Sequence, residues 1–315
     1  MKYCLKCLEP LDSSTTVQWH QGCSQKMFGT KTPPELEINE DILESLAYEA
    51  VRKGVNVTGV QKKLSLNLDN TERNSRLTLV DYPTGYILKV ASLEYEQLPE
   101  FESLAMNLAQ QADLDVVEHG LLKVKDGSLA YITKRIDRLF SKNGVEKLYM
   151  EDFCQLSERI TEDKYKGSYE QCGNVVKQYS TQRMLDLSTL FYVILFSYVI
   201  GNSDMHLKNF SLYSPSAERI ILSPAYDLLP VSLLIEDSEQ TALTLLGKKS
   251  NIKSSDFIKL ASNFGLDSKV APRMIDKLAS LEDTFIEYTK RSFLNSENKK
   301  RMSALISERV KKLTD

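Results

Sequence analysis

Apolar residues between positions 63 and 136 are spaced mostly as in a β-sheet. They alternate with polar residues from Lys63 to Leu68, as expected for a strand with one buried face. Further strands are predicted at residues 77–79, 86–90, 116–124 and 129–136. A helical spacing interrupts this series from Phe101 to Leu108. The pattern therefore predicts an antiparallel sheet of five strands with one helix inserted after the third strand.

The spacing after Glu151 predicts mainly helices. The longest apolar run, Leu190–Ile200, has 11 residues. Because a bilayer requires roughly 20, this run predicts a buried helix and no membrane segment. The other predicted features are a loop over 163–179, short strands between 210 and 225, an amphipathic helix through Met274–Tyr288 and a last helix through Met302–Leu313. A sheet-rich half followed by a helix-rich half indicates the α+β class.

Three of the five cysteines cluster near the N-terminus with a histidine. Cys4 and Cys7 form a C-x2-C pair, and His20 and Cys23 form an H-x2-C pair after a spacer of 12 residues. This spacing is typical of a small Cys3His zinc knuckle. We therefore expect a zinc-knuckle-like segment over residues 1–30, with zinc in a structural role because four protein ligands leave no open position. A chance arrangement, or an ancestral site that has lost its metal, is the alternative.

The sequence after the buried helix is polar and carries groups suited to phosphoryl transfer. Asp204, His206 and Asn209 fall in one short loop, and Asp227 follows 18 residues after Asn209. A carboxylate can orient or deprotonate an attacking hydroxyl, while an amide oxygen and a second carboxylate can hold the magnesium ions that bridge the phosphates. The spacing of Asp204 and Asn209 is that of the protein-kinase catalytic loop, and Asp227 stands where the metal-binding acid of kinases falls. His206 replaces the basic residue that usually stands two places after the catalytic aspartate.

Lys89 lies inside a predicted strand that is otherwise apolar. In kinases, a lysine on the third strand contacts the nucleotide phosphates and pairs with a glutamate of the following helix. Glu102 is the first candidate for this partner, followed by Glu100 and Glu96. Taken alone, Lys89 would more simply be a lysine on an edge strand that faces water. The ordered set of groups along the chain favours the kinase interpretation.

With these segments the chain resembles the HipA family of serine/threonine protein kinases, the toxin half of bacterial toxin–antitoxin systems. The resemblance is carried by a phosphate-binding loop at Val57–Lys63, a hinge strand at Tyr131–Arg138, a catalytic loop at Gly201–Asn209 and a metal-binding segment at Leu222–Pro230. It implies a bilobal, protein-kinase-like fold. The N-lobe would cover residues 31–136 with an antiparallel sheet, and the helical C-lobe residues 137–315. The nucleotide is expected in the cleft between them.

The resemblance assigns roles to individual residues. It implies that Asp204 is the catalytic aspartate and that Asn209 and Asp227 are magnesium ligands. Backbone groups of Lys134 and Ile136 would hold the adenine. The residues implied to bind ATP are Thr58, Gly59, Val60, Gln61, Lys62, Lys63, Lys89, Glu102, Lys134, Arg135, Ile136, Asp137, His206, Asn209, Tyr226 and Asp227.

The resemblance also implies that Asp137 and His206 line the nucleotide pocket. Asp137 is flanked by Arg135 and Arg138, so a structural ion pair is the alternative. The sequence leaves both interpretations of Asp137 open.

The phosphate-binding loop departs from the family pattern in two ways. It has a single glycine, Gly59, and Asn56 stands where family members carry an autophosphorylated serine. Thr58 is the only hydroxyl residue between Gly54 and Lys63, which makes it the candidate for autophosphorylation. A plain turn residue is the alternative for Thr58.

Charge and length bear on the partners that the resemblance implies. Lys+Arg 40 against Asp+Glu 43 give a net charge of −3, so we expect no direct binding of nucleic acid. The length of 315 residues leaves no room for the extra N-terminal subdomain of long family members. This points to the short, HipT-like branch, in which a small HipS-like protein supplies that subdomain and a DNA-binding, HipB-like antitoxin represses the operon. No apolar leader opens the sequence, so the cytoplasm is the expected location, with export by a route without a cleavable signal left open.

The expected function is an ATP- and magnesium-dependent serine/threonine protein kinase that also phosphorylates itself. The family implies a translation protein, such as an aminoacyl-tRNA synthetase, as substrate. A small-molecule kinase of the same fold is one alternative, because the catalytic set is indifferent to what bears the hydroxyl. An inactive pseudokinase scaffold and a zinc-dependent nucleic-acid binder are further alternatives, both with weaker support in the sequence.

Overall fold

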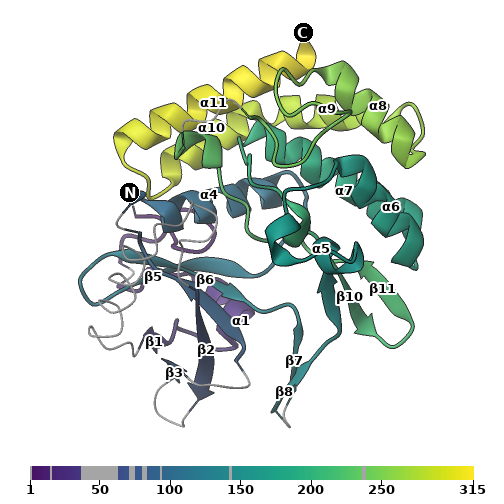
Figure 1. Cartoon of the computed structure of the whole chain (residues 1–315). Helices are drawn as coiled ribbons and strands as arrows, with labels where there is room; N and C mark the ends of the chain where they lie inside the picture. Colours follow the sequence, from purple (N-terminus) through teal and green to yellow (C-terminus); the bar gives the residue numbers. More distant parts are fainter. Residues whose placement is uncertain are drawn as a thin grey trace. The chain divides into compact units, whose positions relative to one another are not determined.

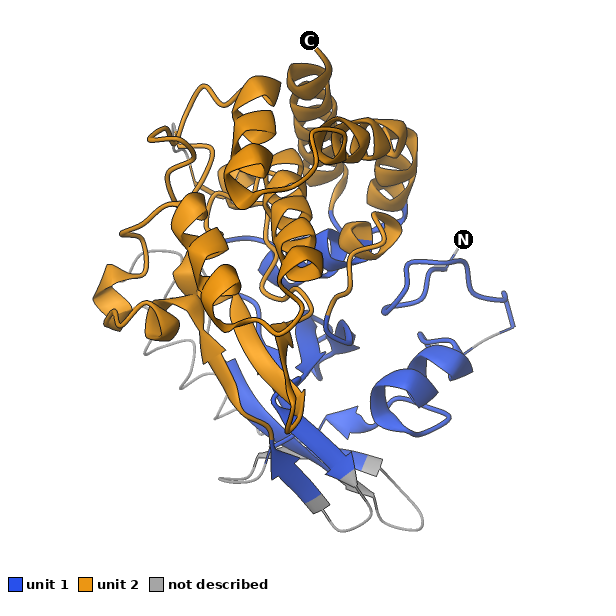
Figure 2. Cartoon of the chain, turned by 90° about the vertical axis from the view of Figure 1, so that its right-hand side faces the viewer, with its two compact units in different colours: residues 1–107, 117–147, 291–294 blue, residues 108–116, 148–290, 295–315 orange. Residues whose placement is uncertain are grey.

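The computed structural model describes residues 2–14, 16–36, 63–70, 75–79, 84–92, 94–141, 144–235 and 239–315. The elements that they form are shown in Figure 1. The chain divides into two compact units, which Figure 2 shows in separate colours. Unit 1 comprises Met1–Asn107, Val117–Lys147 and Arg291–Leu294, and unit 2 comprises Leu108–Val116, Leu148–Lys290 and Asn295–Asp315.

Unit 1 is built on a six-stranded sheet with the strand order β1-β3-β2-β4-β6-β5. Its strands are β1 (Glu35–Leu36), β2 (Lys63–Asn70), β3 (Ser75–Leu79), β4 (Tyr86–Lys89), β5 (His119–Lys123) and β6 (Leu129–Lys134). The five predicted strands are present and pair antiparallel. The predicted number of strands was too low, because β1 adds a sixth strand that runs parallel to β3. A strand of two residues is too short to show a periodic pattern, so β1 could not be predicted from the sequence.

The inserted helix is present as α4 (Leu98–Gln111), between β4 and β5 in the chain. Its residues Phe101, Leu104, Ala105 and Leu108 are buried, as their helical spacing predicts. The polar side chain of Asn107 lies on the same helix and contacts Nε2 of His119, at the start of β5, at 3.4 Å. The helix is thereby attached to the sheet by polar as well as apolar groups.

The N-terminal knuckle, residues 2–14 and 16–28, also belongs to unit 1. It contains the helix α1 (Gln21–Phe28), which ends at Gly29 in the left-handed conformation. Buried apolar side chains of the knuckle include Leu5, Leu8 and Trp19. The knuckle therefore packs as part of unit 1 and is no free extension of the chain.

Unit 1 also contains the small hairpin of β7 (Arg138–Ser141) and β8 (Gly144–Lys147), which was not predicted from the sequence. Unit 2 contains the sheet β11-β10-β9, formed by β9 (Met150–Asp152), β10 (Ser211–Ser216) and β11 (Arg219–Leu222). The short strands expected between 210 and 225 are thus confirmed.

Unit 2 is otherwise helical, with α7 (Arg183–Val199) at its centre. Its other α-helices are α5 (Phe153–Leu156), α6 (Tyr169–Tyr179), α8 (Ser254–Phe264), α9 (Val270–Ser280), α10 (Glu282–Arg291) and α11 (Ser296–Thr314). Short 3-10 turns cover Thr161–Asp163 (η1), Leu207–Asn209 (η2) and Val231–Leu233 (η3). The helices α6, α8, α9 and α11 all contact α7, so the apolar run predicted to be buried forms the core of this unit. Within the described ranges, no helix combines the length and the apolar character that crossing a membrane requires.

Two predictions for unit 2 were wrong. The segment 163–179, predicted as a loop, forms η1 and the helix α6, in which Tyr169, Cys172 and Val176 are buried. The single helix predicted through Met274–Tyr288 is two helices, α9 and α10, separated at Leu281.

Candidate active site

Lys89 is the last residue of β4, a strand in the interior of the sheet. It lies opposite Lys63 on β2 and Tyr131 on β6. Its side chain is only 5% exposed, and its Nζ lies 5.5 Å from the centre of the Tyr131 ring. The structure therefore rules out the alternative of a solvent-facing lysine on an edge strand.

Lys89 forms an ion pair with Glu102, the first of the three predicted partners. The distance between Lys89 Nζ and Glu102 Oε1 is 2.5 Å, and Glu102 is 1% exposed. The pair joins β4 to α4. Burial of two charges is costly unless they are paired closely, and their mutual attraction then grows in the apolar surroundings. The lysine ammonium is thus held in a fixed position by a partner from the helix.

A second charged group follows β6. Arg135 donates two hydrogen bonds to the Asp137 carboxylate, with distances of 2.9 Å from Nε and 2.7 Å from Nη2. Arg138 Nη1 donates to the same carboxylate at 2.5 Å. Burial alone would raise the pKa of Asp137, but the hydrogen bonds and charges of the two arginines lower it below its usual range. The structure contains the ion pair that we considered as the alternative for Asp137.

The backbone near this group is partly engaged by the sheet. The N–H of Lys134 donates to the Glu118 carbonyl at 2.8 Å, and the N–H of Arg135 donates to the Gly85 carbonyl at 2.9 Å. The N–H of Lys134 is thus used within unit 1. In a backbone hydrogen bond with an adenine, Lys134 would therefore act as an acceptor through its carbonyl oxygen.

In unit 2, the loop that carries Asp204 begins where α7 ends. Gly201 follows the last helical turn with φ of +72°, in the left-handed region. A Cβ at this position would lie against Ser232 Oγ and 2.6 Å from Leu305 Cδ2. Glycine is therefore required here both by the backbone conformation and by the close packing.

Asp204 is held from several sides within unit 2. Tyr165 OH donates to Asp204 Oδ1 at 2.6 Å, and the Asp204 N–H donates to Asn202 Oδ1 at 3.2 Å. His206 Nε2 lies 3.9 Å from Asp204 Oδ2. The Tyr165 and His206 rings meet edge to face, with centroids 5.0 Å apart. A carboxylate fixed in this way is suited to orient a reacting hydroxyl.

Asn209 is fixed by the same loop. Its Nδ2 donates to the Asp204 carbonyl at 3.0 Å, and its backbone N–H donates to the His206 carbonyl at 2.9 Å. With Nδ2 engaged, the side-chain oxygen is the atom that remains to act as a ligand.

Lys208 and Tyr226 form further hydrogen bonds around the loop that carries Asn209. Lys208 Nζ donates to Asp152 Oδ2 at 2.8 Å. Tyr226 OH donates to the Lys208 carbonyl at 3.1 Å and lies 2.6 Å from Ser211 Oγ.

Asp227 follows Tyr226 and has φ of +59°, which is uncommon for a residue other than glycine. An amide oxygen from Asn209 and a carboxylate from Asp227 are the oxygen ligands that Mg²⁺ prefers, so this donor set fits the ion.

The four predicted zinc ligands come together in the knuckle of unit 1. The ligand atoms of Cys4, Cys7, His20 and Cys23 all lie within 4.8 Å of one another. All three cysteines are free thiols. Hydrogen bonds from the Cys23 and Cys7 thiols hold the pKa of the Cys4 thiol well below its usual range.

The structure thus brings the predicted residues together in separate groups. Unit 1 holds Lys89 with Glu102, and Arg135 with Asp137, while unit 2 holds Asp204, His206 and Asn209. Lys63 is exposed at the start of β2, whereas Thr58, Gly59, Val60, Gln61 and Lys62 lie outside the described residues.

Three residues of the site were missed by sequence reasoning. Tyr165 bonds Asp204 directly but lies in the segment that was predicted to be a loop. Lys208 and Asp152 form an ion pair next to Asn209. Lys208 could have been found from its place beside Asn209, whereas Asp152 and Tyr165 are distant in sequence and carry no signal of their own.

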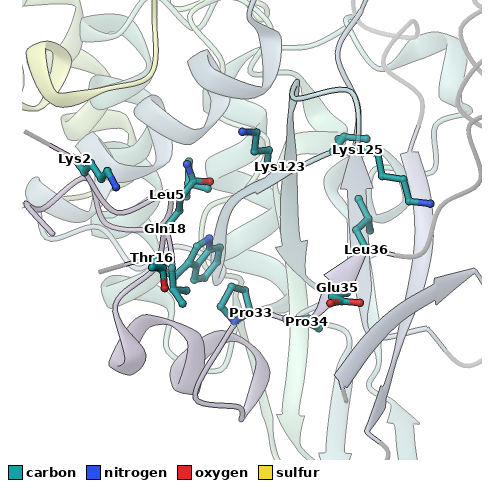
Figure 3. A pocket seen from close by; sticks show the side chains of 13 residues that line it. Lys2, Leu5, Thr16, Gln18, Pro33, Pro34, Glu35, Leu36, Lys123 and Lys125 are labelled. Carbon is teal, nitrogen blue, oxygen red and sulfur yellow. The ribbon is translucent and has the colours of Figure 1, made fainter. Parts of the chain in front are cut away.

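The cavities lined by described residues include one of about 710 Å³ and one of about 670 Å³. The larger one lies in unit 1 beside the knuckle, and Figure 3 shows Lys2, Lys123 and Lys125 among its lining side chains. Neither cavity contains a residue that was predicted to bind ATP.

Comparison with known proteins gives a consistent result. A family model described as the HipA-like C-terminal domain matches residues 55–285. A Haemophilus influenzae protein named as a candidate kinase is 24% identical over 316 aligned residues, which cover 90% of this chain and 91% of that protein. The candidate kinase Y4dM of Sinorhizobium fredii is 31% identical over 258 residues, which cover 77% of this chain but only 60% of that protein.

A solved structure shows a similar fold. It is a chain from the complex of the Shewanella oneidensis MR-1 toxin–antitoxin proteins HipA and HipB with operator DNA. The TM-score is 0.70 at 17% identity, and the match covers 88% of this chain and 70% of that one. The match confirms the predicted α+β fold of the kinase-like, HipA-like type.

Proposed function

Because this chain belongs to the HipA-like C-terminal domain family and is a kinase of the HipA type, we propose that it transfers the γ-phosphoryl group of ATP to a serine or threonine hydroxyl of a protein. Unit 1 supplies the cation for the phosphates, and unit 2 supplies the groups for the acceptor hydroxyl and the metal.

The buried pair of Lys89 and Glu102 is the observation that carries the proposal. A lysine whose side chain is 5% exposed, held at 2.5 Å by a glutamate from a neighbouring helix, has no simple role in a scaffold. Apolar residues at both positions would cost less to bury. A fixed cation is what a nucleotide with several phosphate charges requires. We therefore assign Lys89 to the phosphates and Glu102 to the positioning of Lys89.

In unit 2, Asp204 would accept or orient the proton of the acceptor hydroxyl. Its carboxylate is held by Tyr165, which limits the directions in which it can point. Asn209 and Asp227 would hold magnesium, which supplies neutralising charge for the phosphates. Asn209 is already oriented by its bond to the Asp204 carbonyl. The loop can thereby hold Asp204, which would act on the acceptor, and Asn209, which would bind the metal, in fixed positions relative to each other.

The test measures transfer of labelled phosphate from ATP, in the presence of Mg²⁺, to components of a lysate of the organism from which the protein comes. The wild type should label one protein band. Asp204→Gln should lower the rate on the order of 10²–10⁴-fold with little loss of nucleotide binding, because the lost group acts on the acceptor. Asp276→Gln, at an exposed position of α9, is the matched control and should behave as the wild type. Full activity of Asp204→Gln would refute the assignment, and labelled metabolites in place of a protein band would favour a small-molecule kinase.

We further propose that the enzyme phosphorylates itself at Thr58. The support is its hydroxyl, which is the only one between Gly54 and Lys63. A phosphate there would add about −1.5 to −2 charge to a segment that the resemblance assigns to phosphate binding. Mass spectrometry after incubation with ATP and Mg²⁺ should find phosphate on Thr58 in the wild type and none in Asp204→Gln. An active wild type without phosphate on Thr58 would refute this regulation.

The remaining parts of the proposal rest on the family. We propose a translation protein, such as an aminoacyl-tRNA synthetase, as substrate, and a cytoplasmic location. The Shewanella protein occurs in a complex with HipB and operator DNA. By extension, we propose a small HipS-like and a DNA-binding HipB-like partner for this chain. Phosphoproteomes of cells that express the wild type or Asp204→Gln would identify the substrate directly.

A further inference from the structure

The knuckle of unit 1 gathers four metal-binding side chains that the proposed kinase activity does not use. Their ligand atoms are Sγ of Cys4, Cys7 and Cys23 and a ring nitrogen of His20, all within 4.8 Å of one another. His20 Nδ1 lies 3.3 Å from Cys7 Sγ and 3.9 Å from Cys23 Sγ. We propose that these four residues bind one structural zinc ion. This proposal is independent of the proposed function.

The two distances from His20 to the cysteine sulfurs are close to those of tetrahedral coordination. Zinc–sulfur bonds of about 2.3 Å and zinc–nitrogen bonds of about 2.0–2.1 Å place two ligand atoms of a tetrahedron roughly 3.5–3.8 Å apart. The two distances from His20 Nδ1 lie near this range. The largest separation of 4.8 Å requires a contraction of about 1 Å when the ion binds. Side-chain rotations of cysteine are sufficient for such a change.

The surroundings of His20 orient it as a metal ligand. Its Nε2 lies 3.0 Å from the Pro10 carbonyl oxygen, so Nε2 carries the proton and Nδ1 presents its lone pair to the sulfurs. Histidine ligands of zinc are held in this way by a carbonyl or carboxylate at the other ring nitrogen. Pro10 itself is fixed by a backbone bridge to Tyr3, next to Cys4. The Pro10 carbonyl, which orients the His20 imidazole, therefore belongs to the same small loop as Cys4.

The backbone around Cys4 also fits a bound metal. The N–H of His20 donates to Cys4 Sγ at 3.4 Å and so links the two pieces of chain that carry the ligands. The N–H of Leu8 donates to the Cys4 carbonyl at 3.1 Å, which closes the turn between Cys4 and Cys7. His20 and Cys23 are brought together by α1, because His20 is its N-cap and Cys23 lies in its first turn. Two separate pieces of chain thus each present a pair of ligands.

Four protein ligands leave no open coordination position, so the ion would be structural. The described part of the knuckle is too short for a core of its own, and it attaches to the edge strand β5. The Leu121 N–H donates to the Leu5 carbonyl at 2.9 Å, and Trp19 Nε1 donates to the Leu121 carbonyl at 3.0 Å. Gly120 permits this contact, since a Cβ there would lie 2.6 Å from the Trp19 ring. Zinc would hold the knuckle in the shape that makes these contacts.

The knuckle also supports the elements that carry the Lys89–Glu102 pair. Asn107 on α4 donates from Nδ2 to the Lys6 carbonyl at 3.0 Å, between two of the proposed ligands in sequence. Tyr86 on β4 donates to the Met27 carbonyl at 3.0 Å, and the Phe28 ring packs 5.5 Å from the Tyr86 ring. Lys6 and Lys26 both pair with Glu118, next to β5, at 2.9 and 2.7 Å. The proposed zinc would thus help to position β4 and α4 indirectly, through the contacts that the knuckle makes with them.

The first experiment measures the metal content of the untagged 315-residue protein by inductively coupled plasma mass spectrometry. We expect one zinc ion per chain, with loss in Cys4→Ser and Cys7→Ser. Cys154→Ser is the matched control, because Cys154 is a free, buried thiol in α5 whose Sγ donates to the Ile160 carbonyl at 3.1 Å, a bond that serine can keep. The control should retain the full complement of zinc. Absence of zinc from the wild type, equal zinc in Cys4→Ser, or stoichiometric iron would overturn the proposal.

A second measurement covers the case in which the cysteine variants do not fold. Co²⁺ exchanged into the wild type should give the intense visible bands of a tetrahedral thiolate site, and His20→Cys should keep the metal with a shifted spectrum. Bands typical of octahedral Co²⁺ bound to oxygen ligands would overturn the assignment of the four residues.

Hydrogen exchange tests the effect on unit 1. Removal of zinc by a chelator should speed exchange in β5 and α4, and should leave α11 of unit 2 unchanged. An equal increase along the whole chain, or no increase in β5, would refute the positioning role.

Discussion

Gly201 is the residue at which α7 turns into the loop that carries Asp204. Gly201→Ala should lower the free energy of unfolding for two reasons. The left-handed conformation at φ of +72° costs an alanine about 1–2 kcal/mol, and the contact of its Cβ with Ser232 and Leu305 adds roughly 1–3 kcal/mol. Urea unfolding measures the sum.

The control for Gly201 is Gly265→Ala. Gly265 ends α8 with φ of +83°, but a Cβ there would meet nothing within 4 Å. This variant should lose only the backbone contribution of about 1–2 kcal/mol. Equal losses in the two variants would show that the packing around Gly201 adapts and that the clash is not a constraint.

The pair of Lys89 and Glu102 can be separated into a structural and a functional part. Lys89→Met leaves the Glu102 carboxylate buried without the lysine, which should destabilise unit 1 by about 3–5 kcal/mol. Adding Glu102→Gln removes that charge and should recover most of the loss. Kinase activity should stay absent in both variants, because the cation for the phosphates is missing. Recovery of activity with stability would contradict the assigned role of Lys89.

At the scale of residues, the groups with a local pattern could be predicted from the sequence. Asp204 and Asn209 stand at a fixed spacing in one loop, and Lys89 is a charge within an apolar strand. Tyr165 could not be predicted as a partner of Asp204, because 39 positions separate them and only the folded chain brings them together. Sequence spacing thus identifies the reactive groups, while the residues that orient them depend on tertiary structure.

At the scale of elements, α6 was not predicted because the segment 163–179 is polar and contains three tyrosines and two glycines, a composition that favours a loop. Tyr169, Cys172 and Val176 are buried at helical spacing, and Ser168 stands directly before the helix as its N-cap. These are the ordinary signals of a helix start and an apolar stripe. Tyrosine and cysteine thus form part of the buried stripe of α6, which the polar composition of the segment conceals.

The cap of α6 provides a test of this element. Ser168 accepts a hydrogen bond from the Gln171 N–H at 3.3 Å. Ser168→Ala should cost about 1 kcal/mol of unfolding free energy, whereas Ser168→Asp, which keeps an acceptor, should cost much less. Denaturant unfolding of the two variants measures the difference. Equal costs would indicate that the cap does not stabilise the helix.

The separation of α9 from α10 shows a limit of periodicity. The apolar residues continue at steps of three and four through Leu281, so their spacing predicts one helix. Leu281 ends α9 with φ of −94° and ψ of 2°, and the Phe285 N–H donates to its carbonyl as α10 begins. Glu282 and Asp283 in the first turn of α10 are the sequence signal of a new N-terminus. The stripe of apolar residues alone does not reveal a break of one residue.

At the scale of the whole molecule, the order of motifs predicted the fold class and the family correctly. A strand lysine, a helix glutamate, a loop with Asp204 and Asn209 and a later Asp227 occur in the order that kinases require. The family model and the solved HipA chain agree with this prediction. Strand β1 and the hairpin of β7 and β8 were not predicted, because such short elements take their stability from neighbours rather than from their own sequence.

The stability of the whole chain should depend on pH through His119. This residue is fully buried, and burial lowers its pKa from 6.5 to about 4, with the Lys6 charge acting in the same direction and the Val117 carbonyl and Glu118 opposing it. The unfolded chain takes up a proton near pH 6.5 that the folded chain refuses until about pH 4. The contribution is therefore complete above pH 6.5 and is lost as the pH falls toward 4.

The size of this effect follows from the shift in pKa. A fall from 6.5 to about 4 corresponds to roughly 3 kcal/mol of unfolding free energy lost across that interval. His119→Gln should flatten the profile between pH 4 and 6.5, and urea unfolding at several pH values measures it. A variant with the slope of the wild type would show that other groups cause the acid sensitivity.

The attachment of the knuckle to β5 has a consequence for solubility. An uncovered edge strand offers its backbone N–H and C=O groups to any other chain, and this is a common route to aggregation. Both outward groups of Leu121, at the middle of β5, are occupied by Leu5 and Trp19. The knuckle therefore takes the place that a neighbouring molecule would otherwise fill, and its loss would expose a strand ready to pair with a second copy of the chain.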